Sequence, residues 1–176
     1  MKFFETNLPG AFIIDIDKME DERGFFARSW CEREADLYGL NPQWRQCNIS
    51  FNRHKGTLRG MHFQAAPFEE AKLVRCTKGA IYDVIIDLRS NAPSYRKWAA
   101  VELTEENRRM LYVPEDFAHG FLTMKDNTEV FYQMSEFYAP NSARGIRWND
   151  PAFGISWPAE INVISDRDNS YPDFVA

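Results

Sequence analysis

Three side chains between positions 56 and 87 have the types and spacing needed for proton transfer on an anionic carbonyl compound. His62 lies among large apolar residues, Arg59 precedes it by three positions, and Lys72 opens the next run of strand-forming residues. Imidazole is the side chain whose unperturbed pKa lies closest to neutrality, so His62 is the natural base. The two cations could hold a phosphate or stabilise an enolate. The stretch therefore predicts chemistry on a phosphorylated carbonyl compound.

Each of the titratable residues is ambiguous when it is considered alone. A single histidine among apolar residues, such as His62, is more often a hydrogen-bonded structural residue than a catalyst. His119 is expected where a loop meets a strand, facing a cavity mouth, although a turn histidine bonded to the backbone fits as well. Asp168 follows Arg167 in a polar segment that could be a solvated turn. Tyr132 could be a core aromatic, and its phenol, with a pKa of about 10, needs help to act as an acid.

Several common chemistries lack their minimal motifs. The three histidines, His54, His62 and His119, do not occur at metal-ligand spacing with one another or with a nearby cysteine or acid, so we expect no metal. No glycine-rich phosphate loop precedes a helical pattern, and no Gly-x-Ser-x-Gly segment occurs. Dinucleotide-dependent, triphosphate-dependent and serine-hydrolase activities are therefore disfavoured, and we expect no cofactor.

Length and composition indicate one globular domain spanning residues 1–176. Apolar residues make up 44% of the chain, which is enough to build a core. The net charge of −5 argues against nucleic acid as the main partner, because such binding needs an excess of Lys and Arg. No signal peptide or membrane-spanning run is apparent, so we expect a cytoplasmic protein without a membrane partner. The widely spaced Cys31, Cys47 and Cys76 are expected to be reduced thiols.

The elements that would position these residues are mostly strands. Short strand-forming runs alternate with turn signals at the spacing of a β-sandwich or barrel, and none alternates with a long helical pattern. Regular alternation along the strand at 57–64 would place His62 on one face and Arg59 on the other. The predicted strands are 44–51, 57–64, 72–77, 80–88, 98–103, 110–113, 120–124 and 128–138.

The first forty residues predict a hairpin and one short helix. The runs 11–16 and 25–30 flank a polar turn at 19–24, which is typical of a hairpin. A helix is predicted over 30–38, with Ser29 as its N-cap and Gly39 as its stop signal. A sandwich of this length leaves edge strands that can be protected by a second copy, so we expect a homodimer.

Five segments stand out along the chain: 56–64, 72–75, 114–121, 148–150 and 165–168. In their order and separations they resemble the motifs of the dTDP-4-dehydrorhamnose 3,5-epimerase family. The likeness runs from about Asp21 to Asp168, which is nearly the whole chain. It implies an all-β, cupin-like jelly roll with short peripheral helices, dimeric and active without metal or nicotinamide. The implied substrate is a nucleotide-linked 4-keto-6-deoxyhexose.

The resemblance also implies roles for individual residues. Removing a proton next to a ketone is feasible only if the enolate is stabilised as it forms, and inversion needs a proton returned to the opposite face. The implied catalytic residues are His62 as the base, Asp168 as the carboxylate that holds it, Tyr132 as the proton donor and Lys72 as the cation beside the keto oxygen. Nucleotide-sugar contacts are implied for Arg23, Gln46, Asn48, Arg59, His119 and Arg167, with Tyr138 stacked on the base.

The sequence departs from the family pattern around the expected nucleotide. Arg28 stands where the family commonly has Glu, Cys47 stands where it has Asp, and a second acid is missing near Ala143. The identity of the nucleotide base is therefore not fixed by the sequence, and a CDP-sugar is one alternative substrate. Inversion at C3, at C5 or at both carbons of the sugar is compatible with the motifs. Three other readings are a non-catalytic sugar-nucleotide binding module, a keto isomerase of the same fold and a metal-dependent cupin oxygenase.

Overall fold

The computed structural model describes residues 1–41 and 43–175, and within these it contains thirteen strands and two short helices. The final residue of the predicted domain, Ala176, lies outside this range. The helices are α1 (Glu32–Asp36) and α2 (Asp166–Asn169). The strands are β1 (Lys2–Glu5), β2 (Phe12–Asp15), β3 (Met19–Asp21), β4 (Gly24–Phe26), β5 (Gln46–Asn52), β6 (Leu58–Gln64), β7 (Lys72–Lys78), β8 (Ala80–Asp87), β9 (Trp98–Thr104), β10 (Met110–Val113), β11 (Phe117–Thr123), β12 (Thr128–Met134) and β13 (Ala143–Gly145).

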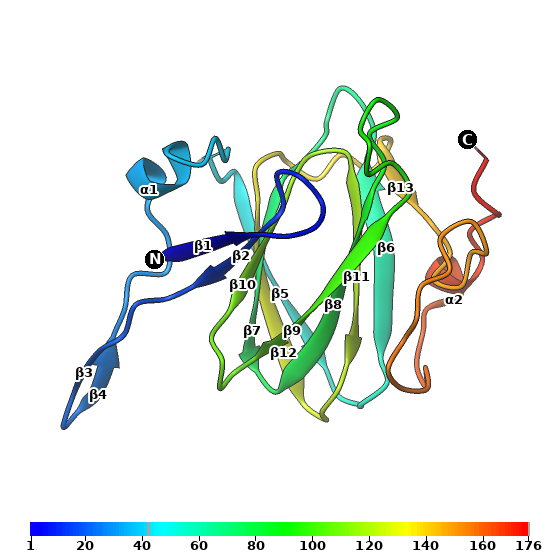
Figure 1. Cartoon of the computed structure of the whole chain (residues 1–176). Coiled ribbons are helices and arrows are strands. Elements are labelled where there is room, and N and C mark those ends of the chain that lie inside the picture. The colour runs from blue at the N-terminus through cyan, green and yellow to red at the C-terminus, as the bar shows by residue number, and fades with distance from the viewer. Residues whose placement is uncertain (42, 176) are drawn as a thin grey trace.

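Two antiparallel sheets pack face to face (Figure 1). One has six strands in the order β1-β2-β10-β7-β12-β5, and the other has five in the order β13-β6-β11-β8-β9. From β5 to β8, and again from β9 to β13, each successive strand crosses to the other sheet, which is the connectivity of a jelly roll. The predicted fold class, an all-β cupin-like jelly roll with short peripheral helices, is confirmed.

The core lies between the sheets and takes every second residue from each. The alternation of strand side chains sends one set inward, and burying each large apolar side chain contributes roughly 1.5–3 kcal/mol. Tyr132 and Ile13 are only partly buried and pack against the edge of this cluster. Its fully buried members include Val74, Ile81, Ile85, Leu103, Leu111 and Val130.

The outer faces of the two sheets are covered by the ends of the chain. The segment around α1 covers the six-stranded sheet, where Ala35 and Leu40 pack with Leu73 and Tyr112. The segment after β13 covers the five-stranded sheet, and Phe153 joins its cluster. Figure 1 shows α2 and the C-terminal segment lying beside β6. This covering brings residues near position 168 to the strand that carries His62.

The predicted N-terminal hairpin has different partners in the structure. Strand β2 pairs with β1 and β10, not with the run at 25–30. The hairpin that does form is the short β3–β4 pair, in which Met19 lies opposite Phe26. It projects away from the sheets (Figure 1). The prediction of a hairpin around the polar turn was right, but its assigned strands were wrong, because β2 is held by the edge of the six-stranded sheet.

Helix α1 is shorter than predicted. Its N-cap is Cys31 and not Ser29, and Cys31 makes no capping bond through its side chain. Its end agrees with the prediction: Gly39 has a φ of +67°, and the N–H of Leu40 donates to the carbonyl of Ala35 at 3.2 Å. This backbone arrangement needs a left-handed residue, which glycine supplies without strain.

Candidate active site

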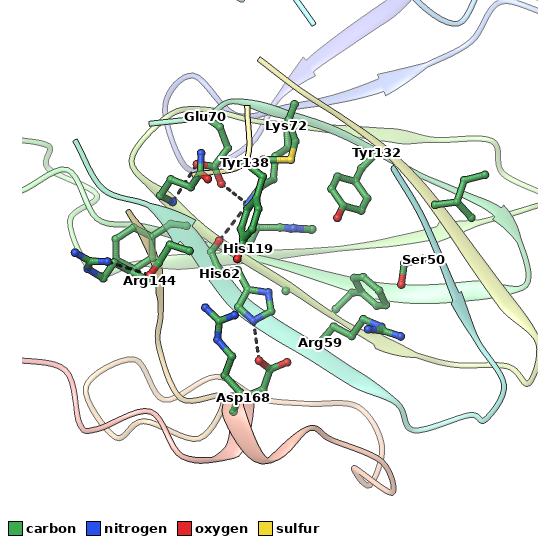
Figure 2. A pocket seen from close by; sticks show the side chains of 18 of the residues that line it. Ser50, Arg59, His62, Glu70, Lys72, His119, Tyr132, Tyr138, Arg144 and Asp168 are labelled. Atoms are coloured by element: carbon green, nitrogen blue, oxygen red, sulfur yellow. Dashed lines mark hydrogen bonds and ion pairs between the residues drawn. The ribbon is translucent and has the colours of Figure 1, made fainter. Parts of the chain in front are cut away.

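A cavity of about 400 Å³ opens between the two sheets and is lined by side chains from both. Figure 2 shows these side chains converging on one space. Eight of the eleven predicted site residues line it: Arg59, His62, Lys72, His119, Tyr132, Tyr138, Arg167 and Asp168.

His62 and Asp168 form a hydrogen-bonded pair at the cavity wall (Figure 2). The Nε2 atom of His62 lies 2.7 Å from Oδ1 of Asp168, although 106 positions separate the two residues. Burial raises the pKa of Asp168, but the hydrogen bond and charge of His62, with the N–H of Gly60, lower it further than burial raises it. The net pKa lies below the ordinary carboxyl value, so Asp168 stays ionised and accepts a hydrogen bond from the Nε2–H group of His62. The Nδ1 atom of His62 is thereby left as a proton acceptor.

The C-terminal segment that carries Asp168 is held by several side chains that follow β13. The Nη1 atom of Arg147 donates to the carbonyl of Tyr171 at 3.2 Å. The indole N–H of Trp148 donates to Asn169 at 3.1 Å, and the N–H of Phe174 donates to Asp150 at 2.6 Å. At the start of α2, the N–H of Asp168 itself donates to the Ser165 hydroxyl at 3.1 Å. These bonds explain why a short polar helix keeps a fixed place instead of forming a solvated turn.

Strand β6 carries a bulge that corrects the predicted face assignment. His119 pairs with His62 while Phe121 pairs with Arg59, so β6 spans three positions where β11 spans two. Gly60 lies within the bulge with a φ of +130°, and a β-carbon there would overlap Gly120. Regular alternation placed Arg59 and His62 on opposite faces, but the added residue turns both toward the cavity.

Lys72 enters the cavity as one member of a buried ion pair. Its Nζ lies 2.8 Å from a Glu70 carboxylate oxygen and donates to the carbonyl of His62 at 3.1 Å. Both side chains are almost fully buried, at 7% and 3% exposure. Sequence reasoning missed Glu70. The available signal was a lysine inside a buried strand pattern, because a buried ammonium needs a carboxylate nearby.

Tyr132 reaches the cavity from the six-stranded sheet, whereas His62 comes from the five-stranded sheet. Figure 2 shows its phenol directed into the space that His62 also faces. Burial raises the pKa of Tyr132, and the positive charge of Arg59 offsets only part of that rise. The phenol therefore stays protonated at neutral pH and can donate its proton to an anion that forms in the cavity.

A second histidine–carboxylate pair lies beside the first. His119 sits in the middle of β11, not where a loop meets a strand, because β11 starts earlier than predicted at Phe117. Its Nε2 lies 2.7 Å from Oδ1 of Asp83. Asp83 is fully buried, and its second oxygen has no hydrogen-bond partner in the described part of the chain. Sequence reasoning missed Asp83, although an acid inside the apolar run 80–87 was a visible signal.

Arg59 and Arg167, two of the remaining predicted residues, line the cavity. Arg59 donates to Asn52 at 2.7 Å, and Arg167 donates to the Tyr171 hydroxyl at 3.0 Å. The hydrogen bonds that Arg167 donates to Tyr138 and Tyr171 raise the pKa of its guanidinium. In residues 1–41 and 43–175, neither arginine has a carboxylate within ion-pair distance. Both are therefore available to an anion.

Three predicted residues do not line the cavity of their own chain. Gln46 accepts the backbone N–H of Tyr138 at 2.8 Å and donates to Asn48 at 3.3 Å, so both lie at its margin. Arg23 lies on the β3–β4 hairpin, where it pairs with Asp21 and is 86% exposed. The fold of one chain does not bring Arg23 to the cavity.

No metal-binding group of three or more His, Cys, Asp or Glu side chains occurs within the described residues. No helix among those residues is long and apolar enough to span a membrane.

The jelly roll and its cavity define an enzyme that moves protons by acid–base chemistry, since an oriented imidazole and a protonated phenol face one space beside a buried ammonium. A family model described as dTDP-4-dehydrorhamnose 3,5-epimerase matches residues 5–175. A relative of that name from Shigella flexneri is 38% identical over 99% of this chain and 97% of its own.

Solved structures agree with this match. A dTDP-4-dehydrorhamnose 3,5-epimerase from Elizabethkingia anophelis superimposes with a TM-score of 0.95 at 36% identity, covering 99% of this chain and 96% of that one. An epimerase from Legionella pneumophila in complex with dTDP-4-keto-L-rhamnose gives 0.88 at 34% identity, covering 95% and 89%. The chain belongs to the dTDP-4-dehydrorhamnose 3,5-epimerase family. It is an isomerase that epimerises a nucleotide-linked keto-deoxysugar.

Proposed function

We propose that His62 and Tyr132 are the two acid–base residues of this epimerase and that they act on opposite faces of a 4-keto-6-deoxyhexose ring. The observation that carries the proposal is that the two side chains enter one cavity from opposite sheets. A sugar ring between them would present one face to the imidazole and the other to the phenol. Lys72, on the same cavity wall as Tyr132, would lie near the keto oxygen.

The first step removes a proton from the carbon next to the ketone. The Nδ1 atom of His62 is the acceptor, because Asp168 holds the Nε2 proton at 2.7 Å. The electron pair of the broken C–H bond moves onto the keto oxygen and gives an enolate, which the Lys72 ammonium stabilises. The ionised Asp168 stabilises the imidazolium that forms on His62.

The second step returns a proton to the opposite face of the same carbon. The Tyr132 phenol donates it, the enolate collapses to the ketone, and the stereocentre is inverted. The phenolate that results lies near the positive charge of Arg59. Exchange with water then reprotonates Tyr132 and deprotonates His62, so the cycle needs no cofactor.

The nucleotide would occupy the cavity mouth, where Arg59 and Arg167 face a diphosphate and Tyr138 stacks on the base. Gln46, Asn48 and His119 would complete the contacts with the nucleotide sugar. A dTDP-sugar is the proposed substrate, as supported by the ligand named for the Legionella pneumophila structure. A CDP-sugar is the alternative, because Ala143 lines the cavity where the family pattern has an acid.

A homodimer would explain two features of the β3–β4 hairpin. Its Phe25 and Phe26 are 43% and 69% exposed, which is unusual for large apolar side chains on a projecting element. Arg23 would then meet the cavity of the partner subunit. Analytical ultracentrifugation tests this: Phe26→Ser should shift the protein toward monomer, and a monomeric wild-type protein would contradict the proposal.

We also propose that residues 1–176 form one epimerase domain, as supported by the family match over 5–175. A cytoplasmic location is proposed because the three widely spaced cysteines do not form a disulfide pattern.

Incubation with dTDP- and CDP-4-keto-6-deoxyglucose in deuterated water tests the reaction. Deuterium at C3 alone, at C5 alone or at both, read by NMR, identifies the carbons that exchange a proton. The configuration of the product shows which of them are inverted, and the faster substrate identifies the nucleotide. His62→Ala is the matched control and should abolish exchange. Wild-type exchange in that variant would refute the assignment of the base.

A further inference from the structure

Tyr171 lies behind the cavity wall and contacts two of the side chains that line it. It is itself outside the cavity lining, yet its ring meets the His62 imidazole edge to face, with centroids 6.3 Å apart and planes at 73°. Its hydroxyl accepts the Nε proton of Arg167 at 3.0 Å. A single side chain therefore links the proposed base to a proposed phosphate-binding cation.

The ring of Tyr171 has room there because the facing residue is a glycine. Gly145 on β13 is the register partner of His62 on β6. A β-carbon at Gly145 would overlap the Tyr171 ring and its hydroxyl. Gly145 thus leaves a flat surface of backbone against which the ring lies, directly beside the imidazole.

The backbone of Tyr171 is fixed independently of its side chain. Its carbonyl accepts from Arg147 at 3.2 Å, and the neighbouring segment is held through Asp150 and Phe174. A side chain can restrain its neighbours only if its own backbone is fixed, so the Tyr171 ring can act as a rigid support. Asp168 fixes His62 through one nitrogen, and Tyr171 limits rotation of the ring about that bond.

We propose that Tyr171 is a positioning residue that orients His62 through its ring and Arg167 through its hydroxyl. The two functions reside in different atoms and so can be separated. The ring would affect the proton-transfer step, whereas the hydroxyl would affect binding of the nucleotide diphosphate. The inference rests on the proposed role of His62 as the base.

Steady-state kinetics of three variants test the proposal. Tyr171→Phe keeps the ring and loses the hydroxyl, so KM for the nucleotide sugar should rise about three- to tenfold while kcat stays within twofold. Tyr171→Leu also loses the ring, so kcat should fall at least tenfold. Gly145→Ala displaces the ring and should lower kcat similarly. Tyr82→Phe is the matched control, since Tyr82 packs on Trp157 away from the cavity, and it should leave both constants unchanged.

A binding measurement separates this proposal from the assignment of the base. Calorimetry with dTDP should show the same weakening in Tyr171→Phe whether or not His62 is the base. If His62→Ala keeps solvent exchange, the proposed base is wrong, but a loss of dTDP affinity in Tyr171→Phe still supports the link to Arg167. Unchanged kcat in both Tyr171→Leu and Gly145→Ala overturns the link to His62. Unchanged KM and dTDP affinity in Tyr171→Phe overturn the link to Arg167.

Discussion

His62 and His119 are directly opposite one another on neighbouring strands, and each holds a carboxylate 2.7 Å from its Nε2 atom. The two pairs differ in access. The side chain of His62 is 42% exposed, and that of His119 is 9% exposed. Only the more exposed imidazole has the open approach that a base attacking a sugar carbon needs. The two pairs have the same hydrogen-bond distance, and the difference in exposure of the imidazole is what favours His62 over His119 as the base.

The first prediction follows from this contrast. His62→Ala should lower solvent exchange at the sugar carbons by about 10²–10⁴-fold, the usual contribution of a general base. His119→Ala should mainly raise KM. Exchange followed by NMR and initial rates over a range of substrate concentrations measure the two effects. A larger loss of exchange in His119→Ala than in His62→Ala would reverse the assignment.

Tyr132→Phe should separate proton removal from inversion. The variant keeps His62 and Lys72, so a proton can still leave and return on the His62 face. Deuterium should therefore enter the sugar while the inverted product forms at least tenfold more slowly than in the wild type. Tyr82→Phe, which removes a phenol outside the cavity, is the control. Equal loss of exchange and inversion in Tyr132→Phe would mean that the phenol is needed for proton removal as well.

The Glu70–Lys72 pair allows stability and activity to be separated. Lys72→Met leaves a buried carboxylate without its cation and should lower the free energy of unfolding by about 3–5 kcal/mol. The double variant Lys72→Met with Glu70→Gln should regain most of that stability, because no charge is left unpaired. Both should lose at least about 10²-fold in kcat, since neither can stabilise an enolate. Urea unfolding and initial rates measure the two properties, and recovery of activity in the double variant would contradict the role of Lys72.

The pH dependence of stability should reveal Asp87, a buried acid outside the cavity. Burial raises its pKa, but hydrogen bonds from Arg89 and Ser94 outweigh burial and leave the pKa below the ordinary value. Its contribution is therefore complete above about pH 4, the usual range of an unfolded Asp, and is lost as the pH falls through the lower folded value. The free energy of unfolding of Asp87→Asn should lie below that of wild type at neutral pH, and the gap should narrow below about pH 4. A gap that does not change with pH would contradict this prediction.

Gly60→Ala tests the bulge in β6. The residue needs a positive φ, and a β-carbon there would overlap the Gly120 backbone. Gly24 is a matched control, because it has a similar φ of +124° with open space around it. Gly24→Ala should carry only the backbone penalty of about 1 kcal/mol or somewhat more. Gly60→Ala should be destabilised further in thermal unfolding and should lose activity, because Arg59 and His62 would move. Equal stability of the two variants would show that β6 relaxes around the new side chain.

Much of this architecture could be predicted from local patterns. The strands from β5 to β12 follow runs whose length and flanking turns are visible in the sequence, and the Gly39 stop signal works as expected. The predicted strand pairing was wrong where contacts between distant parts of the chain decide it. Strand β2 is the example, because it pairs with β10, which lies nearly a hundred positions away. The resemblance predicted that His62, Tyr132, Lys72 and Asp168 belong to one site, and all four line the cavity. Asp83, Glu70 and Tyr171 were missed because their importance depends on which neighbour the fold supplies.

The irregularity in β6 has an evolutionary consequence. Inserting one residue between His119 and Phe121 would let β6 and β11 pair without interruption, and it would remove the demand for a left-handed glycine. The resulting sheet would be more regular, but Arg59 and His62, three positions apart on a strand without a bulge, would face opposite sides and one of them would turn outward. Selection for thermal robustness alone would therefore favour losing the bulge, and only selection on turnover would preserve it.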